Sequence, residues 1–395
     1  MSASPEQAAR VAAVKATRKL DEIIAEDGQQ LGRANGRGIR EGMCLCHPVK
    51  GKKPFWVNGE SGSFGCLKGH GCGGDIFDYF EQFRDLSFRD ALAELEEDSV
   101  PMDAQDLERL EQKRAVEREA REVRRRDQAE KERRQNYEKW RETVPAVPSP
   151  VADYLVARGI TLTDACKSLR YAPDEPYWYV DGDKPKRVHT GPCMMAAITG
   201  ADGRFMGLHR TWLDLDNAPS FKADLRGPDG EPLKAKKMRG SKKGGAIWLV
   251  NYNPHDPRPA LLLAGEGIET TFSAHAAALA AGLGDAWQVL AAAMGDLGNM
   301  SGPTLGPSTK HPDGRGFIPS NEPDLREVAF VPPPHVQAGI LLGDGDSEPL
   351  ATRARLTAAQ KRWAHHGCAT LVAMAAEGLD FNDMWRAHMA GQEAA

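Results

Sequence analysis

The long charged segment in the first half of the chain limits what this protein can fold into more than any other feature. Residues 104–141 are dense in Glu, Lys and Arg, contain no Gly or Pro, and have only sparse apolar positions. Such a segment has no face to bury, so it is predicted to be a long solvated helix or a charged linker. Fully helical, it would span on the order of 55 Å at 1.5 Å per residue. We expect it to hold two domains apart, and the missing a/d heptad favours a spacer over a coiled coil.

The sequence before this spacer begins with helix signals. Ser4, Pro5 and Gln7 have the positions of an N-cap, a first-turn proline and a capping-box partner. They predict a helix that runs to about Glu26 and stops near Gly28.

The pattern of apolar residues and turn signals changes twice after the spacer. The run VPAVPSP at residues 144–150 breaks any helix. Strand-like runs follow at residues 194–198 and 208–213, separated by turn signals. From residue 260 onward, apolar strands alternate with helices: a strand at 260–264 precedes a helix to Ala281, and a strand at 339–342 precedes a helix to His366. This alternation predicts an α/β domain with a mainly parallel sheet.

A cluster of cysteines lies between the first helix and the spacer. We expect one tetrahedral zinc held by Cys44, His47, Cys66 and Cys72, because two ligand pairs separated by a strand-rich hairpin can converge on one metal. Cys46 and His70 remain alternative ligands, since the gap from Cys66 to Cys72 is wider than usual.

Acidic residues follow the apolar strands of the last third of the chain. Glu266 comes just after the strand at 260–264, and Asp344 and Asp346 follow the strand at 339–342. Strand ends are where α/β sheets place their sites, and paired carboxylates call for magnesium or manganese. A third acidic group, Asp380 and Asp383, comes after another apolar run, and its carboxylates are further candidate ligands for magnesium or manganese.

Basic side chains gather before this acidic region. The net charge of −5 is unevenly distributed, and residues 234–243 read KAKKMRGSKK. Ammonium groups there could hold template phosphates or the triphosphate of a nucleotide, and an exposed aromatic and basic strand near the cysteines would suit a nucleic-acid strand. The candidate nucleic-acid or nucleotide ligands are Lys53, Trp56, His209, Arg210, Lys236, Lys237, Lys242 and Lys243. A solvated lysine-rich loop remains the alternative for the basic run.

These motifs and their order resemble a known family. The cysteine cluster followed by CGGDIFDYF at residues 72–80 resembles the zinc-binding domain of DnaG-type DNA primases, and the three acidic groups resemble the Toprim domain that these primases share with topoisomerases and some nucleases. EGIET at residues 266–270 and HRTWL at 209–213 are similar to a phage and plasmid primase-like subgroup. Thr270 stands where family members often have an aspartate.

The resemblance implies a multidomain fold with four parts. Residues 1–100 would form the N-terminal helix and the zinc ribbon, which is β-rich with helices, and residues 101–150 the charged helical linker. An α+β region at 151–257 would form the N-terminal part of the catalytic core and lead into an α/β Toprim domain at 258–395.

The resemblance also implies a function. The chain would be a nucleotidyltransferase that makes short RNA primers on a single-stranded DNA template from ribonucleoside triphosphates. Glu266, Asp344 and Asp346 would be catalytic, with Asp344 and Asp346 binding divalent metal and Glu266 acting as a metal ligand or general acid/base. The ribbon would contact the template. The alternatives are a Toprim-type nuclease and a non-catalytic single-stranded DNA-binding accessory protein.

Two further expectations concern partners and location. No GxxxxGK[ST] phosphate loop occurs in the sequence, so unwinding would require a separate replicative helicase. The longest apolar stretch, near residues 286–294, is too short for a membrane span, and the expected location is the cytoplasm.

Overall fold

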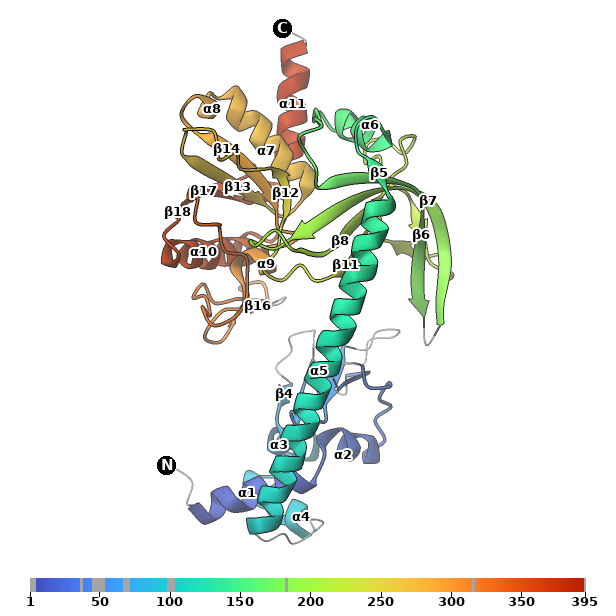
Figure 1. Cartoon of the computed structure of the whole chain (residues 1–395). Helices are drawn as coiled ribbons and strands as arrows, with labels where there is room; N and C mark the ends of the chain where they lie inside the picture. The colour runs from blue at the N-terminus through green and yellow to red at the C-terminus, as the bar shows by residue number, and fades with distance from the viewer. Residues whose placement is uncertain are drawn as a thin grey trace. The chain divides into compact units, whose positions relative to one another are not determined.

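The computed structural model describes residues 5–35, 38–44, 54–66, 72–97, 104–181, 184–314 and 317–393. The chain divides into two compact units (Figure 1). The first comprises Met1–Arg125 together with Gly314–Gly316, and the second comprises Arg126–Asp313 and Phe317–Ala395. The charged segment is one continuous helix, α5 (Ala104–Glu142), which is the first of the two forms expected for it. The division between the units falls inside this helix.

The first unit packs helices against a small antiparallel sheet with the order β1-β2-β3-β4. Its core contains Phe55 and Val57 of the second strand, with Ile76 and Phe80 from the helix that follows the sheet. The elements are α1 (Pro5–Thr17), α2 (Leu20–Glu26), β1 (Ile39–Gly42), β2 (Phe55–Asn58), β3 (Ser63–Cys66), β4 (Gly73–Gly74), α3 (Ile76–Arg84) and α4 (Phe88–Glu97).

The single N-terminal helix expected to reach Glu26 is two helices in the structure. The chain leaves the helical path at Arg18 and Lys19 and re-enters it at Leu20. The second helix buries Leu20, Ile23 and Ile24 in the core of this unit, so the break allows the apolar side chains to face inward.

The second unit contains an antiparallel sheet with the order β11-β8-β7-β6-β5. The strand-like runs predicted at residues 194–198 and 208–213 lie in β7 and β8, with the last residue of the second run just past the end of β8. The elements of this region are β5 (Val144–Pro145), α6 (Pro150–Ala157), β6 (Leu169–Asp181), β7 (Lys184–Thr199), β8 (Phe205–Trp212), β9 (Leu225–Arg226), β10 (Pro232–Leu233) and β11 (Lys236–Gly240).

A second sheet of this unit has the order β12-β14-β13-β17-β18. Its β13 pairs in parallel with β14 and β17, and β17 pairs in parallel with β18, whereas the edge strand β12 is antiparallel to β14. The elements are β12 (Ile247–Val250), β13 (Ala260–Gly265), α7 (Ile268–Ala280), α8 (Leu283–Ala286), β14 (Gln288–Ala293), α9 (Leu297–Ser301), β15 (Thr309–Lys310), β16 (Phe317–Ile318), β17 (Val336–Gly343), α10 (Pro349–His365), β18 (Ala369–Met374) and α11 (Phe381–Glu393).

Helices cover both faces of this sheet (Figure 1). Leu262 and Ala264 of β13 point into a core with Trp363 of α10, while Leu263 points to the opposite face, where it meets Ala274 of α7. This alternation follows from the two-residue period of a strand. The mixed α/β architecture expected from the sequence is therefore present, and no helix in the described ranges is long and apolar enough to cross a membrane.

A third core joins the two sheets of the second unit. Met194 and Ile198 of β7 pack with Ile247 of β12 and with Ile268 of α7. The antiparallel sheet is thus fixed against the start of α7, which is where the acidic strand ends of the parallel sheet lie.

The buried side chain of Arg362 in α10 joins three backbone positions of the second unit. Its buried guanidinium donates to the carbonyl oxygens of Ser301, Glu327 and Asp324 at 2.9, 3.1 and 2.7 Å. We expect Arg362→Leu to lower the free energy of unfolding by about 3 kcal/mol, because buried acceptors lose their donors. Arg353→Leu, an exposed position on the same helix, should change it by less than about 0.5 kcal/mol. Urea denaturation of both variants measures the difference. Equal effects would show that the three hydrogen bonds of Arg362 do not stabilise the unit.

Candidate functional sites: a cysteine cluster and an acidic pocket

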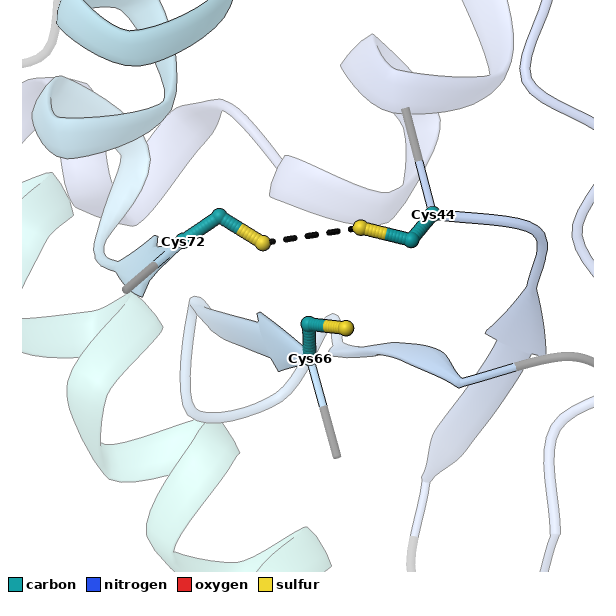
Figure 2. A group of neighbouring side chains, drawn as sticks. All are labelled: Cys44, Cys66 and Cys72. Atoms are coloured by element: carbon teal, nitrogen blue, oxygen red, sulfur yellow. Dashed lines mark hydrogen bonds between the residues drawn. The ribbon is translucent and has the colours of Figure 1, made fainter. Parts of the chain in front are cut away.

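Three cysteines of the first unit lie together at one end of its small sheet (Figure 2). Cys44 follows β1, Cys66 ends β3, and Cys72 immediately precedes β4. Their sulfur atoms all lie within 4.8 Å of one another, and the Sγ atoms of Cys44 and Cys72 are 3.6 Å apart. Sulfurs that share a tetrahedral zinc at about 2.3 Å are separated by roughly 3.8 Å. The three thiols therefore fit a zinc ion.

The predicted fourth zinc ligand lies outside the residues that the structure describes. His47, the predicted ligand, and its competitors Cys46 and His70 lie outside the described residues. Lys53, predicted to contact nucleic acid, lies there too. Trp56 is in β2 opposite Gly65 of β3, and a side chain at Gly65 would meet the indole ring at 2.9 Å.

A pocket of the second unit gathers the predicted acidic residues. Its cavity of about 230 Å³ is lined by Glu266 from the end of β13, Asp344 from the end of β17 and Asp380 just before α11. These strand ends lie at one edge of the sheet because β13 and β17 are parallel neighbours.

Asp344 is the most perturbed of these carboxyl groups. Burial, followed by the nearby charges of Glu266, Asp380 and Asp346, raises its pKa to about 7. Its Oδ1 atom is buried and has no hydrogen-bond partner among the described residues. Burial and the charges of Asp296 and Asp346 also raise the pKa of Glu266, despite a backbone hydrogen bond from Leu297.

A cation would relieve this repulsion. The carboxylates do not form a closed cage, since among the described residues only the three cysteines form a group of metal-ligating atoms within 4.8 Å. Magnesium keeps several waters and is usually held by one or two carboxylates together with substrate phosphates. An open arrangement with an unpaired buried oxygen on Asp344 fits such an ion.

Two predicted acidic ligands lie outside the lining of this pocket. Asp346 is exposed in the turn after β17, although its charge reaches both Asp344 and Glu266. Asp383 is exposed on α11, where its backbone N–H donates to Asp380 Oδ1 at 2.8 Å. Asp380 therefore both caps this helix and lines the pocket.

Thr270 lines the acidic pocket and contacts the carboxylate of Asp344. A side-chain hydrogen bond from Thr270 opposes the rise in the pKa of Asp344. A hydroxyl at this position can donate to the carboxylate, whereas an ionised aspartate could only accept.

The same pocket is also lined by the basic side chains of Lys222 and Lys236, here called the basic wall, and Glu269 pairs with both. This carboxylate is buried in α7 and lies 3.1 Å from Lys222 Nζ and 3.3 Å from Lys236 Nζ. The hydroxyl of Tyr154 in α6 also donates to it. Burial alone would raise the pKa of Glu269, but the two ammonium groups and this hydrogen bond hold it well below its usual value.

His209 and Arg158 complete the basic wall. Burial and the charge of Lys236 lower the pKa of His209 to about 4, so its imidazole is neutral at pH 7. Asn382 of α11 donates to the carbonyl oxygen of Arg158 at 2.7 Å, which fixes the end of α6 beside the pocket.

The other predicted basic residues lie away from the lining of this pocket. Arg210 and Lys237 alternate with His209 and Lys236 along β8 and β11, and the carboxylate of Glu175 is 2.8 Å from Arg210 Nη1. Lys242 forms an ion pair with Asp296, and Lys243 pairs with Glu327 at 3.0 Å.

Sequence reasoning missed four residues of this site. Glu269 lies within the EGIET motif but has no role assigned from the sequence, and Tyr154, Arg158 and Lys222 belong to segments without a motif. The alternation of side chains along a strand could have separated Lys236 from Lys237, but nothing local indicates that Lys222 lies beside Glu269.

Comparisons with known proteins give the following matches. Residues 130–249 match the model of a protein family described as a domain of unknown function, DUF7146. No curated protein matches the sequence. Among solved structures, the zinc-binding and RNA polymerase domains of the Aquifex aeolicus primase are 14% identical, with 98% of this chain and 84% of that chain covered and a TM-score of 0.33.

Another solved structure is a DNA primase domain from Pseudomonas aeruginosa. It is 15% identical, with 62% of this chain and 71% of that chain covered and a TM-score of 0.34. These scores are too low to transfer a function, so the function proposed below rests on the residues of the site.

The cysteine cluster predicts bound zinc. We expect Cys66→Ala to reduce the zinc content of the purified protein from about one ion per chain to well below half, because a thiolate ligand is lost. Cys166→Ala is the matched control: Cys166 is buried in the core between the sheets and should leave the zinc content unchanged. Atomic emission spectrometry gives the ratio, and full zinc retention in Cys66→Ala would exclude Cys66 as a ligand.

The Glu269 cluster predicts a pH-dependent contribution to stability. Because the folded pKa of Glu269 lies below its unfolded value of about 4.3, the carboxylate stabilises the fold above that pH and loses its effect as the pH falls through the folded pKa. We expect Glu269→Gln to lower the free energy of unfolding by about 2 kcal/mol at pH 7, since it leaves two partly exposed ammonium groups without their buried partner.

The pH profile separates this effect from simple loss of packing. The difference in stability between Glu269→Gln and the wild type should be constant from pH 7 to pH 5 and shrink below about pH 4. Glu377→Gln, at an exposed position, should follow the wild-type profile throughout. A difference that does not depend on pH would show that the charge of Glu269 is unimportant.

Proposed function

We propose that this protein is a DNA primase that makes short RNA primers on single-stranded DNA by metal-dependent nucleotidyl transfer. One observation supports this function above all: a single pocket is lined both by the carboxylates Glu266 and Asp344 and by the cations Lys222 and Lys236. Such a pocket suits a polyphosphate that is bound by a metal ion at one end and by ammonium groups at the other.

The acidic wall would hold magnesium or manganese. Asp344 Oδ1, buried and unpaired, and Glu266 are the oxygens best placed to bind the ion, with Asp346 and Asp380 close enough to add negative charge. Bound there, a divalent ion would neutralise the charge that develops as a 3′-hydroxyl displaces pyrophosphate. The resemblance of this region to the Toprim domain agrees with that role.

The basic wall would bind the triphosphate of the incoming ribonucleotide. Glu269 pairs with both Lys222 and Lys236, one on each carboxylate oxygen, so it can hold the two ammonium groups in place before the nucleotide arrives. Preorganised charges cost no rearrangement when the reaction occurs. Arg158 adds a third cation on this wall.

His209 would contribute as a neutral group. Its pKa of about 4 keeps the imidazole uncharged at pH 7, and its buried Nδ1 has no partner among the described residues. A neutral imidazole can accept or donate a hydrogen bond at a sugar or base without adding to the positive charge of the wall.

The cysteine cluster supports the same assignment through the first unit. A zinc ribbon carrying Trp56 on a strand beside Gly65 offers an aromatic ring for a base of the template. A separate replicative helicase would supply the open template, and the phage and plasmid subgroup is the relative that the EGIET motif favours.

Primer synthesis tests this function. Wild-type protein incubated with single-stranded DNA, ribonucleoside triphosphates and magnesium or manganese should make short RNA products. We expect Asp344→Asn to reduce product by at least about 100-fold, because the oxygen proposed to bind the ion is replaced by an amide. Asp285→Asn, an exposed aspartate of α8, is the matched control and should retain full activity.

The same assay separates the alternative functions. If the wild type makes no RNA, or if Asp344→Asn makes as much as the wild type, the protein is not a primase that uses this site. Cleavage of labelled DNA would identify a nuclease instead. Binding of single-stranded DNA with neither product would identify an accessory protein.

A further inference from the structure

A second basic pocket lies on the other face of the antiparallel sheet. It is lined by Asn136, Lys139, Trp178, Leu208, Arg210 and Arg239, all within the second unit. Side chains alternate along β8, so Arg210 points away from the acidic pocket that His209 lines. Nothing in the proposed chemistry uses this second pocket.

The pairing of β8 with β11 places like charges face to face beside this pocket. Lys237 of β11 is the direct partner of Arg210 across the antiparallel pair. Like charges directly opposite one another destabilise a sheet. Burial together with the charges of Arg210 and Arg239 lowers the pKa of Lys237, which reflects this crowding.

One carboxylate offsets these cations only in part. Glu175 is buried and accepts from Arg210 at 2.8 Å and from Lys139, whose Nζ atom is 2.6 Å from it. The three cationic residues of the lining therefore face a single carboxylate, and Arg239 is exposed at the pocket. The excess positive charge favours an anionic ligand.

Two buried donors of the pocket have no partner among the described residues. They are the Nδ2 atom of Asn136 and the Nε atom of Arg210, in side chains that are only 5% and 6% exposed. Buried donors are nearly always hydrogen-bonded, so donors that line a basic cavity indicate an acceptor that enters it.

The size of the pocket limits what that acceptor can belong to. The cavity is about 110 Å³, whereas pockets that enclose a whole small molecule are usually about 300–1,000 Å³. It has room for one phosphate group of a larger ligand. Trp178, 39% exposed, lines the same pocket and offers a ring on which a base can stack.

We propose that this pocket binds a backbone phosphate of a single-stranded nucleic acid, with Asn136, Arg210 and Arg239 as ligands and Trp178 stacking on a neighbouring base. This site deepens the proposed function but does not depend on catalysis.

Binding measurements on the full chain test the site. A fluorescently labelled single-stranded oligodeoxynucleotide is titrated with protein, without nucleotides or added divalent ions, and its anisotropy is followed at several salt concentrations. We expect Arg239→Gln to weaken binding by about 3- to 10-fold and to reduce the slope of log affinity against log salt by about 0.7, the value for one phosphate contact of a single strand. Arg353→Gln, an exposed arginine of α10, should match the wild type in both.

A second variant removes a donor without changing the charge. Asn136→Leu should weaken binding while leaving the salt slope unchanged, and its circular dichroism should confirm that it folds. Wild-type affinity in both Arg239→Gln and Asn136→Leu would overturn the site. A separate titration with ATP identifies the other possible ligand. If both variants bind the oligonucleotide as the wild type does but bind ATP more weakly, the pocket binds a free nucleotide instead.

The outcome is separable from that of the primer assay. A negative result here removes the second pocket but leaves primer synthesis at Asp344 to be decided by its own experiment. Conversely, a protein that makes no primers can still show the predicted dependence on Arg239.

Discussion

The buried carboxylate of Glu269 is the interaction on which the arrangement of the second unit depends. It belongs to α7, the first helix of the parallel sheet, yet its partners come from α6, from β11 and from Lys222 after β8. Breaking an ion pair in such a setting is costly because the remaining charge stays buried. This one side chain therefore links the two sheets at the point where the acidic strand ends open into the pocket.

The same arrangement keeps opposite charges close without letting them cancel. Lys222 and Lys236 are held by Glu269, so they are not drawn to Asp344 and Glu266. Burial and the neighbouring carboxylates raise the pKa values of Asp344 and Glu266, although the charge of Lys242 opposes the rise at Glu266. In such a site the carboxylate charges remain available for a metal ion and the ammonium charges for a polyphosphate. Both ligands would bind more weakly if the acidic and basic side chains were paired with each other.

The sequence predicted those parts that local pattern determines. The apolar runs ending in Glu266 and Asp344 are buried parallel strands, and the charged run is one helix because it has neither glycine nor proline. The strand β14 was overlooked because three of its six residues are alanines, which have little β propensity. Its place between β12 and β13 is set by tertiary packing.

The site was predictable where a local pattern marks its residues, as a cysteine window or an acidic strand end does. Cys44, Cys66 and Cys72 share one short window and come together as expected, whereas Tyr154 and Glu269 are 115 residues apart and meet only in the folded chain. The run from Lys234 to Lys243 was treated as one basic patch, although the structure sends its members to different faces and partners. Composition gives the charge of a segment, and strand geometry decides where that charge lies.

The alternation along β11 also restricts how this protein can change. Lys236 faces the acidic pocket and Lys237 the opposite side, so inserting or deleting one residue within the strand would exchange the two surfaces. Residues 228–231, in the turn before the strand, are exposed, whereas the segment after it is held by hydrogen bonds of Gly244 and Gly245 with the side chain of Asn299. The number of residues in β11 is therefore constrained by the two surfaces that it serves. Related chains should differ in length in the turn before the strand and not within it.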